Sequence, residues 1–176
     1  MRVIGGEFRS RLLTSLPGLD VRPTPDRLRE ALFNVLASRI EGIVFADLYA
    51  GTGAVGIEAL SRGASRVIFI EQNRAAVGVI RRNLKSLEVQ DRADVRQGKV
   101  AALLGSLAAE IVFLDPPYRM ESEYDTALAA LGVRPPPLVI VQHDARAELA
   151  GSYGALRRAR VLRQGDNCLT FYSAET

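Results

Sequence analysis

Hydrophobic and polar positions follow two kinds of pattern from residue 43 onward. Short, unbroken apolar runs are separated by stretches in which apolar residues recur at helical spacing. Unbroken runs of this length are typical of parallel strands that are buried on both faces of a sheet. The pattern predicts strands at 43–48, 66–71, 93–96, 111–115 and 137–142, and helices at 54–63, 73–88, 99–108 and 122–131. This order indicates a doubly wound α/β domain.

The last part of the chain has a different pattern. Two apolar stretches, 155–164 and 167–173, flank the turn sequence Gln164-Gly165-Asp166. A turn of this kind between two β-like runs predicts an antiparallel hairpin. The expected sheet therefore has seven strands, of which at least one is antiparallel.

The first 40 residues form a separate pattern. Alternation around Gly5-Gly6 predicts a short β-hairpin over residues 1–14. Apolar residues at helical spacing predict a helix at 25–40, with Thr24 as its N-cap and Pro25 at its first position. Its opposite face, which includes Arg27 and Arg29, is interpreted as solvated. We therefore expect an amino-terminal hairpin and helix extension at 1–40 and a larger α/β domain at 41–176.

Composition excludes several classes of protein. The chain has 176 residues, 48% of them hydrophobic and 24% charged, as in ordinary globular proteins. Cys168 is the one cysteine and His143 the one histidine, so zinc sites and histidine-dependent triads have almost no ligands or bases to use. We expect no metal and a structural role for His143. The chain has no apolar run of about 18 residues, which predicts a cytoplasmic protein without a membrane span.

The positive charges are mostly arginine, which accounts for 21 of the 23 basic residues. Arginine binds phosphates and base edges with a planar fork of donors. The first 15 residues contain Arg2, Arg9 and Arg11 but the single acid Glu7. This segment is therefore a candidate for contact with nucleic acid.

A glycine-rich loop follows the first predicted strand. Gly51, Gly53 and Gly56 fit the pattern G-x-G-x-x-G at the start of a helix, and Glu71 ends the next strand 20 residues after Gly51. This spacing matches a dinucleotide site, but the same topology also binds S-adenosylmethionine. Asp47, at the end of the first strand, would repel a pyrophosphate and would suit an ammonium or sulfonium group. We expect S-adenosylmethionine, and a nicotinamide-dependent oxidoreductase remains an alternative.

The fourth predicted strand ends in Asp115-Pro116-Pro117-Tyr118. Two prolines remove two N–H donors, so the strand end offers mainly acceptors. Acceptors suit the exocyclic amine of a nucleobase, which Asp115 and the Pro116 carbonyl would hold while Tyr118 stacks on the ring. This geometry would direct the amine nitrogen at a sulfonium methyl group. N6-adenine methylation of DNA and a non-catalytic RNA-binding module remain alternatives.

Four blocks in this order resemble one known family. They are RVIGG with Arg9 and Arg11, RPTPDRLREALFNVL at 22–36, DLYAGTGAVGIEALSRGA at 47–64, and DPPY at 115–118. Together they are similar to the bacterial 16S ribosomal RNA guanine-N2 methyltransferases (RsmD-type). The resemblance implies a Rossmann-like class I methyltransferase sheet. It also implies methyl transfer from S-adenosylmethionine to a guanine N2 of 16S ribosomal RNA, either naked or in a small-subunit assembly intermediate.

The resemblance also assigns roles to residues. It implies a cofactor site at Asp47, Tyr49, Ala50, Gly51, Gly53, Glu71, Gln72, Gln97 and Val100, a catalytic site at Asp115, Pro116, Pro117 and Tyr118, and RNA contacts at Arg2, Arg9, Arg11, Arg22, Thr24 and Arg27. Arg22 and Thr24 would lie either near the cofactor or near the substrate phosphates. The sequence departs from the family at one point. Where such enzymes often have an acid that accepts from the adenine amine, this chain has Lys99, which cannot accept. We expect Gln97 or backbone groups to replace it.

Overall fold

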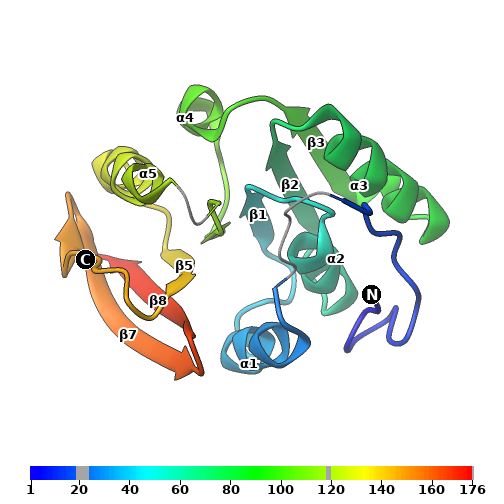
Figure 1. The fold of residues 1–176 in the computed structure, drawn as a ribbon, viewed down its shortest axis with the longest axis horizontal. Coiled ribbons are helices and arrows are strands. Elements are labelled where there is room, and N and C mark those ends of the chain that lie inside the picture. The colour runs from blue at the N-terminus through cyan, green and yellow to red at the C-terminus, as the bar shows by residue number, and fades with distance from the viewer. Residues whose placement is uncertain (19–23, 118–119, 176) are drawn as a thin grey trace.

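A computed structural model of the chain describes residues 1–18, 24–117 and 120–175. In it, eight strands form one mixed sheet in the order β3-β2-β1-β4-β5-β8-β7-β6 (Figure 1). The strands are β1 (Val44–Leu48), β2 (Arg66–Glu71), β3 (Ala93–Gln97), β4 (Ile111–Leu114), β5 (Leu138–Asp144), β6 (Ser152–Tyr153), β7 (Leu156–Gln164) and β8 (Asn167–Ala174). Strands β1 to β5 are parallel, and β8 pairs antiparallel with both β5 and β7. The doubly wound α/β sheet predicted from the sequence is confirmed.

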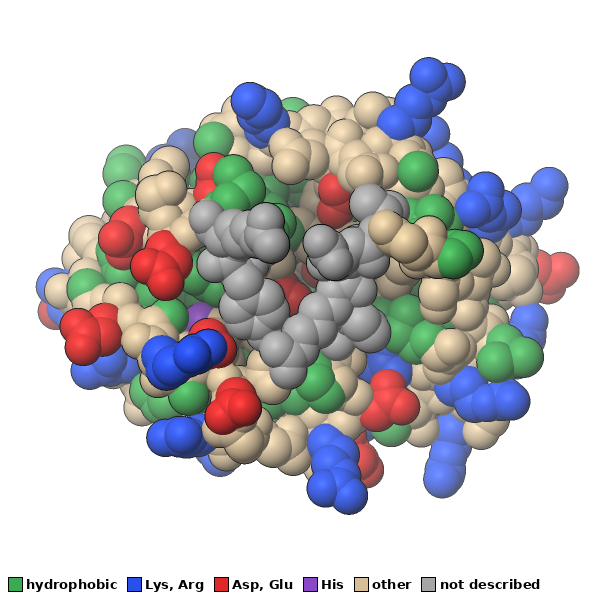
Figure 2. All heavy atoms as spheres, viewed as in Figure 1, with side chains coloured by type: hydrophobic (Ala, Val, Ile, Leu, Met, Phe, Trp, Pro, Cys, Tyr) green, Lys and Arg blue, Asp and Glu red, His purple; other side chains and the backbone are tan. Residues whose placement is uncertain are grey.

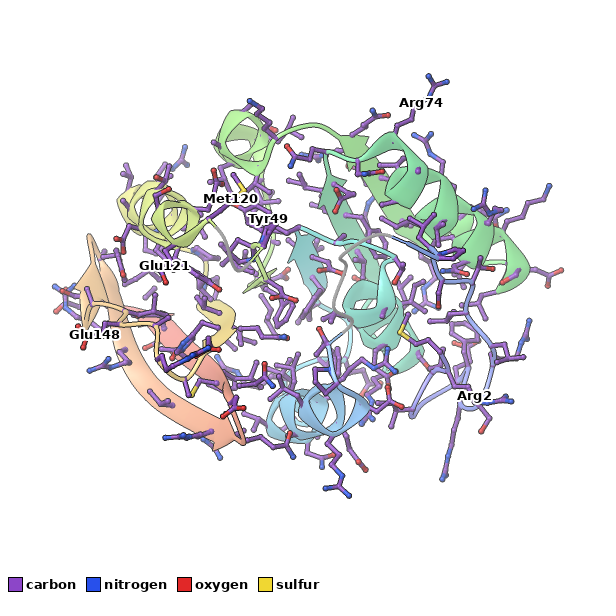
Figure 3. All side chains as sticks on the ribbon, viewed as in Figure 1. Arg2, Tyr49, Arg74, Met120, Glu121 and Glu148 are labelled. Atoms are coloured by element: carbon purple, nitrogen blue, oxygen red, sulfur yellow. The ribbon has the colours of Figure 1, made fainter. Side chains whose placement is uncertain are left out.

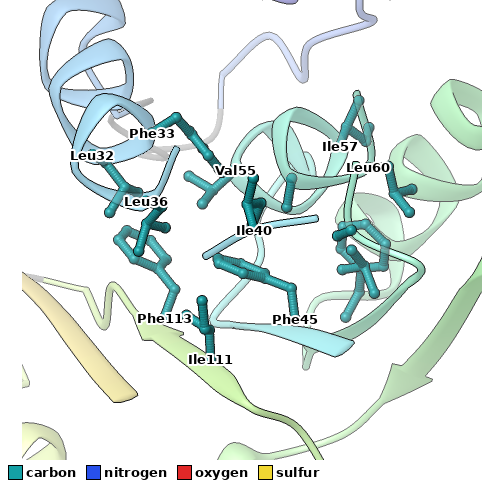
Figure 4. Close-up of a cluster of buried hydrophobic side chains, with 14 of the residues drawn as sticks. Leu32, Phe33, Leu36, Ile40, Phe45, Val55, Ile57, Leu60, Ile111 and Phe113 are labelled. Atoms are coloured by element: carbon teal, nitrogen blue, oxygen red, sulfur yellow. The ribbon is translucent and has the colours of Figure 1, made fainter. Parts of the chain in front are cut away.

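Helices cover both faces of the sheet (Figure 1). They are α1 (Asp26–Leu36), α2 (Ala54–Ser61), α3 (Arg74–Ser86), α4 (Val100–Leu103) and α5 (Glu121–Val133), with short 3₁₀ turns at Gln90–Arg92 and Leu104–Ser106. Side chains of α1, α2 and α3 pack into one hydrophobic core, whose centre is shown in Figure 4. Side chains of α4 and α5 pack into a second core on the opposite face. Strands β1, β2, β4 and β5 contribute to both cores, as unbroken apolar runs require, whereas β3 adds only Ala93 and Val95 to the first.

Two differences from the predicted elements have simple causes. The sheet has an eighth strand, β6, which adds two residues to the edge beside β7. A two-residue strand leaves no periodic signal in the sequence. The helix expected at 99–108 is also shorter, because only Val100–Leu103 is α-helical and a 3₁₀ turn follows. The other predicted boundaries agree within a few residues.

The predicted amino-terminal β-hairpin is wrong in detail. The segment is a loop closed by a single antiparallel bridge between Arg2 and Leu12. Tertiary contacts hold it, because Val3, Phe8 and Leu13 are buried in the core on the side of α1 to α3. The backbone of this segment therefore follows the surface of the larger domain rather than a regular ladder.

The predicted N-cap of α1 is also wrong. The cap position is Pro25, whose carbonyl accepts from Arg29 N at 3.0 Å, and no side chain caps the helix. The Thr24 hydroxyl instead donates to Gln142 Oε1 of β5, at 3.1 Å. The Thr24 side chain therefore bonds the side-chain carbonyl of Gln142 on the sheet and not a backbone N–H of the first turn of α1.

The face of α1 interpreted as solvated contains a buried arginine. The Arg29 side chain is 0% exposed and lies against Glu58 of α2, which is 1% exposed, with 4.0 Å between Arg29 Nε and Glu58 Oε2. Arg29 also donates to the Arg2 carbonyl at 2.7 Å. Glu58 accepts from the backbone N–H groups of Ile4 and Gly5, at 2.9 and 2.8 Å. The pair therefore fixes the amino-terminal loop to α1 and α2, which the helical pattern alone did not predict.

Candidate active site

Four polar side chains lie at the carboxyl ends of neighbouring parallel strands. They are Glu71, Asp47, Asp115 and Gln142, from or directly after β2, β1, β4 and β5. Two positions before each of them is a residue that belongs to the core under α1, α2 and α3. Because side chains alternate along a strand, all four share that face of the sheet. Ligands of open α/β sheets bind at this edge.

Glu71, Asp47 and Asp115 line a cavity of about 700 Å³. Its other walls come from the loop after β1, from residues 98–101 after β3, and from Thr24, Met120 and Glu123. Tyr49 and Met120, which both line the cavity, are labelled near the centre of Figure 3. On the same face in Figure 2, most lysine and arginine side chains lie toward the rim. A cavity of this size is sufficient for a nucleoside cofactor and part of a second substrate.

Each glycine of the loop is required for a different structural reason. Gly51 and Gly53 have positive φ angles of 58° and 81°, a region that disfavours side chains, and Gly53 is the N-cap of α2. A Cβ at Gly56 would overlap the ring of Phe69, so this glycine lets α2 approach the sheet closely. The loop thus brings backbone close to the cavity, as its spacing predicts.

The N–H groups of this loop are occupied by carboxylates of the chain itself. Gly51 N donates to Glu71 Oε2 at 2.8 Å, and Gly56 N, in the first turn of α2, donates to Asp47 Oδ2 at 2.9 Å. In a dinucleotide site, such N–H groups face the pyrophosphate. Here two carboxylates stand in that position. The site is therefore arranged for a cation or a neutral donor rather than for a phosphate.

Asp47 has an unusual environment for a carboxylate. Its side chain is only 2% exposed. Burial raises its pKa well above the ordinary value, and the nearby charges of Asp115 and Glu71 raise it further, although the N–H of Gly56 opposes the shift. A positive ligand beside Asp47 would favour its ionised form.

Tyr49 connects the loop after β1 with α5. It has a positive φ of 60°, and its hydroxyl donates to Glu123 Oε2 at 2.7 Å. Burial and the neighbouring Glu123 carboxylate raise the pKa of the phenol. Glu123 lies in the first turn of α5, shortly after Pro117. The contact therefore joins the cofactor side of the cavity to the segment that follows Asp115.

The structure brings most of the predicted site residues together. The cavity is lined by Thr24, Asp47, Tyr49, Ala50, Gly51, Glu71, Gln72, Val100, Asp115, Pro116 and Pro117. Gly53 belongs to the same loop but does not line the cavity. Gln97 is exposed and does not line the cavity either, whereas the next two residues, Gly98 and Lys99, do. Arg22 and Tyr118 lie outside the described residues.

Four of the five predicted RNA-contact arginines, all except Arg22, lie in the described part of the chain, and none of these four lines the cavity. Arg2, Arg9 and Arg11 are exposed on the amino-terminal loop, and Arg27 is exposed on α1. Arg2 is labelled near the margin of Figure 3, away from Tyr49. Any role of these arginines is therefore at a distance from the site of chemistry.

Sequence reasoning missed several lining residues, among them Glu123 and Met120, and also Gln142, which contacts Thr24 behind the cavity wall. Gln142 ends the apolar run of β5 at the edge where ligands bind, which is a usable signal. Glu123 and Met120 follow the Asp115-Pro116-Pro117 segment closely, but nothing in their local pattern marks them.

His143 has the structural role expected for it. Its ring nitrogens lie 2.8 Å from the Asp144 carbonyl and 2.7 Å from Thr170 Oγ1. Burial lowers its pKa. Both nitrogens are thus engaged within the sheet.

The described residues offer neither a metal-binding cluster nor a membrane-spanning helix. Among residues 1–18, 24–117 and 120–175, no group of three or more His, Cys, Asp or Glu side chains is placed to hold a metal ion. Within the same ranges, no helix has the length and apolar character needed to cross a membrane.

Comparisons with known proteins identify relatives over most of the chain. YlbH of Bacillus subtilis is 33% identical over 169 residues, which cover 91% of both chains. Ribosomal RNA small subunit methyltransferase D of Escherichia coli is 40% identical over 120 residues, which cover 68% of this chain and 61% of that protein. The chain therefore aligns with less than two thirds of the Escherichia coli protein.

Solved structures show the same fold and confirm the predicted Rossmann-like class I methyltransferase sheet. The Escherichia coli protein yhhF superposes with a TM-score of 0.86 and 32% identity, covering 99% of this chain and 98% of that one. An RNA methyltransferase of Salinibacter ruber, solved in complex with S-adenosyl-L-homocysteine, has a TM-score of 0.66. It covers 87% of this chain and 94% of that one, and its 21% identity shows the fold alone.

The family comparison covers nearly the whole chain. The model described as conserved hypothetical protein 95 matches residues 1–173. With the relatives above, this match confirms the resemblance seen in the four sequence blocks. The chain belongs to the conserved hypothetical protein 95 family, the family of the RsmD-type methyltransferases.

Proposed function

We propose that this protein transfers a methyl group from S-adenosylmethionine to the exocyclic N2 amine of a guanine in 16S ribosomal RNA. The observation that carries the proposal is the cavity beside the glycine loop. There, the carboxylates of Glu71 and Asp47 accept hydrogen bonds from the backbone N–H groups of the loop, and Asp115 and Pro116 offer further acceptors. Family membership and the names of the relatives support methylation of ribosomal RNA. The substrate would be the RNA itself or a small-subunit assembly intermediate in the cytoplasm.

The residues present fit S-adenosylmethionine. When bound, this cofactor supplies a methyl group on a positively charged sulfur. Gly51 and its neighbours offer backbone at the cavity wall, and Glu71 has lone pairs left to accept from ribose hydroxyls. Asp47 would stabilise the positive charge. A nicotinamide dinucleotide fits less well, because its pyrophosphate would meet Asp47 and Glu71 instead of free N–H groups.

The target amine fits at the other end of the cavity. Asp115 and the Pro116 carbonyl would each accept one amine hydrogen, which orients the nitrogen lone pair toward the cofactor. The Pro117 carbonyl already accepts from Met120 N at 2.9 Å. Asp115 would also stabilise the positive charge that develops on the nitrogen and accept a proton from it. No covalent nucleophile is required.

Replacing Glu71 with alanine is expected to weaken cofactor binding by about 1.5 to 3 kcal/mol, because a charge-assisted pair of hydrogen bonds to the ribose is lost. Calorimetry with S-adenosylhomocysteine measures the change. Glu71→Gln is the matched control, since it keeps one acceptor for Gly51 N and should lose less. An unchanged dissociation constant in Glu71→Ala would place the ribose elsewhere.

Cofactor affinity is expected to rise with pH as Asp47 loses its proton. Burial raises the pKa of Asp47 well above its ordinary value, so the free protein keeps a proton on Asp47 to a higher pH than an exposed carboxylate would. A cationic ligand favours the ionised form, and its binding therefore releases that proton. Calorimetry in buffers of different ionisation enthalpy measures the release. In Asp47→Asn, the pH dependence should be reduced; if it persists unchanged, another group is responsible.

Changing Arg9 and Arg11 to glutamine is expected to weaken RNA binding without altering cofactor affinity. Arg9 is exposed and has no side-chain partner in the described part of the chain, whereas Arg11 donates to the Ser86 carbonyl. The slope of log affinity against log salt should become shallower by about 0.7 to 0.9 for each lost phosphate contact. Arg39 and Arg134 serve as matched controls, because both are exposed and lie outside the amino-terminal loop. If the Arg9/Arg11 and Arg39/Arg134 double variants show the same slope of log affinity against log salt, the amino-terminal loop does not contact RNA.

A further inference from the structure

Thr24 occupies a distinctive position between the amino-terminal extension and the cavity. It lines the cavity but is only 7% exposed, and its hydroxyl donates to Gln142 Oε1 at 3.1 Å. Gln142 is itself 2% exposed, at the carboxyl end of β5. The two residues are 118 positions apart in the chain. A polar contact buried at this depth fixes the direction of the Thr24 proton.

The contact lies beside the proposed amine site. Leu114 of β4 pairs with Val141 of β5, so Asp115 and Gln142 follow in register on adjacent strands. Neighbouring strands lie about 4.8 Å apart, and both residues share the face that carries Asp47. Along this edge, the order is Glu71, Asp47, Asp115 and then Gln142 with Thr24. The Thr24 hydroxyl therefore lies at the end of the row farthest from the proposed ribose position.

The direction of the Thr24 proton determines what this hydroxyl can bind. A hydroxyl has one donor hydrogen and two acceptor lone pairs. Because the hydrogen is directed to Gln142 Oε1, the oxygen can offer only its lone pairs to a ligand. An atom that meets Thr24 from the cavity must therefore be a hydrogen-bond donor.

Guanine and adenine differ at the atom next to the exocyclic amine. In guanine, the N2 amine is flanked by N1–H, a donor, and by N3, which lies beside the ribose. In adenine, the N6 amine is flanked by N1, which carries a lone pair and no hydrogen. When the amine is held by Asp115, an acceptor beside it favours guanine and disfavours adenine, because two lone pairs would face each other.

We propose that Thr24, with its proton held by Gln142, accepts a hydrogen bond from N1–H of the target base and thereby selects guanine. Thr24 is then a specificity-determining residue, and Gln142 is a positioning residue that acts through it. The inference rests on the proposed function and assigns one contact within it.

The test compares two RNA fragments that differ at the modified position. One carries guanine, and the other carries 2-aminopurine, which keeps the N2 amine but has a lone pair at N1. Both fragments are taken from the segment of 16S RNA around the guanine that the protein methylates, and this position is located first by mapping the methyl label. The wild-type protein should bind guanine RNA about 10-fold more tightly than 2-aminopurine RNA in the presence of S-adenosylhomocysteine. Fluorescence of 2-aminopurine reports its binding directly, and kcat/KM for the two fragments gives a second ratio.

Three variants test whether the preference for guanine RNA over 2-aminopurine RNA comes from the proposed contact. Thr24→Val removes the hydroxyl at nearly constant shape and should bring the ratio close to 1. Thr24→Ser keeps the hydroxyl and should preserve the ratio. Gln142→Met frees the Thr24 proton to turn toward the base and should reduce the ratio. A purely structural role would change both fragments equally and leave the ratio unaltered.

The outcomes separate the inference from the proposed function. A wild-type ratio near 1, or a ratio retained in Thr24→Val, would overturn the role of Thr24 even if guanine is methylated normally. Because the wild-type ratio needs no variant, it tests the inference even if Thr24→Val fails to fold. Absence of methyl transfer to either fragment, with no N2-methylguanosine in the full RNA, would overturn the proposed function itself.

Discussion

Methyl transfer should fall by at least about 100-fold when Asp115 is replaced with asparagine, with little change in cofactor affinity. Asparagine keeps the shape of the side chain but replaces the charge and one acceptor with an N–H₂ donor. The target amine would then face a donor at the moment when positive charge develops on its nitrogen. Loss of a single preorganised electrostatic partner typically costs 10²- to 10³-fold in rate.

Cofactor affinity provides the internal control for this variant. Asp115 is one of the charges that raise the pKa of Asp47. Loss of the Asp115 charge therefore does not disfavour the ionised form of Asp47, and the affinity for S-adenosylhomocysteine should be retained. Single-turnover methyl transfer and calorimetry on the same preparation measure the two effects. Turnover near the wild-type rate would show that the Pro116 carbonyl holds the amine without Asp115.

Replacing Glu58 with alanine should destabilise the protein by about 3 to 5 kcal/mol, the usual cost of breaking a buried ion pair by removing one partner. Arg29 would remain fully buried with only the exposed carboxylate of Asp26 as its partner, 3.1 Å away. The N–H groups of Ile4 and Gly5 would also lose their acceptor. The amino-terminal loop should loosen together with the fold, because both depend on the same side chain.

Denaturant unfolding measures this loss, and the melting temperature should fall by roughly 6 to 20 °C for a domain of this size. The double variant Arg29→Met with Glu58→Met removes both charges and should recover part of the stability. A loss below about 1 kcal/mol in Glu58→Ala would mean that the pair is not needed to hold the loop. The exposed pair between Arg146 and Asp144 is a suitable comparison, since its removal should cost much less.

The parts of the fold that were predictable from sequence are those with local causes. Buried parallel strands read as apolar runs, and the cofactor loop reads as glycines at positions where a positive φ or close helix packing excludes a side chain. The acids Asp47 and Glu71 could be placed at the same edge because each ends a strand. All these inferences use only the neighbours in sequence and the geometry of a parallel sheet.

The parts that were not predictable depend on partners far apart in sequence. Thr24 occupies an N-cap position by local rules, yet its hydroxyl binds Gln142 on the sheet. Arg29 has helical spacing that suggests a solvated face, yet Glu58 and the amino-terminal loop cover it. In each case, a polar group is satisfied by a tertiary partner, which no periodicity records.

The most direct test of the proposed function is the identity of the methylated nucleoside. Small-subunit ribosomal RNA from cells without the gene is incubated with the purified protein and methyl-labelled S-adenosylmethionine, then digested to nucleosides and separated by mass spectrometry. The proposal predicts label in N2-methylguanosine at one position, and no label with Asp115→Asn under the same conditions. Label in N6-methyladenosine, or no transfer to RNA by a protein that binds the cofactor, would contradict it.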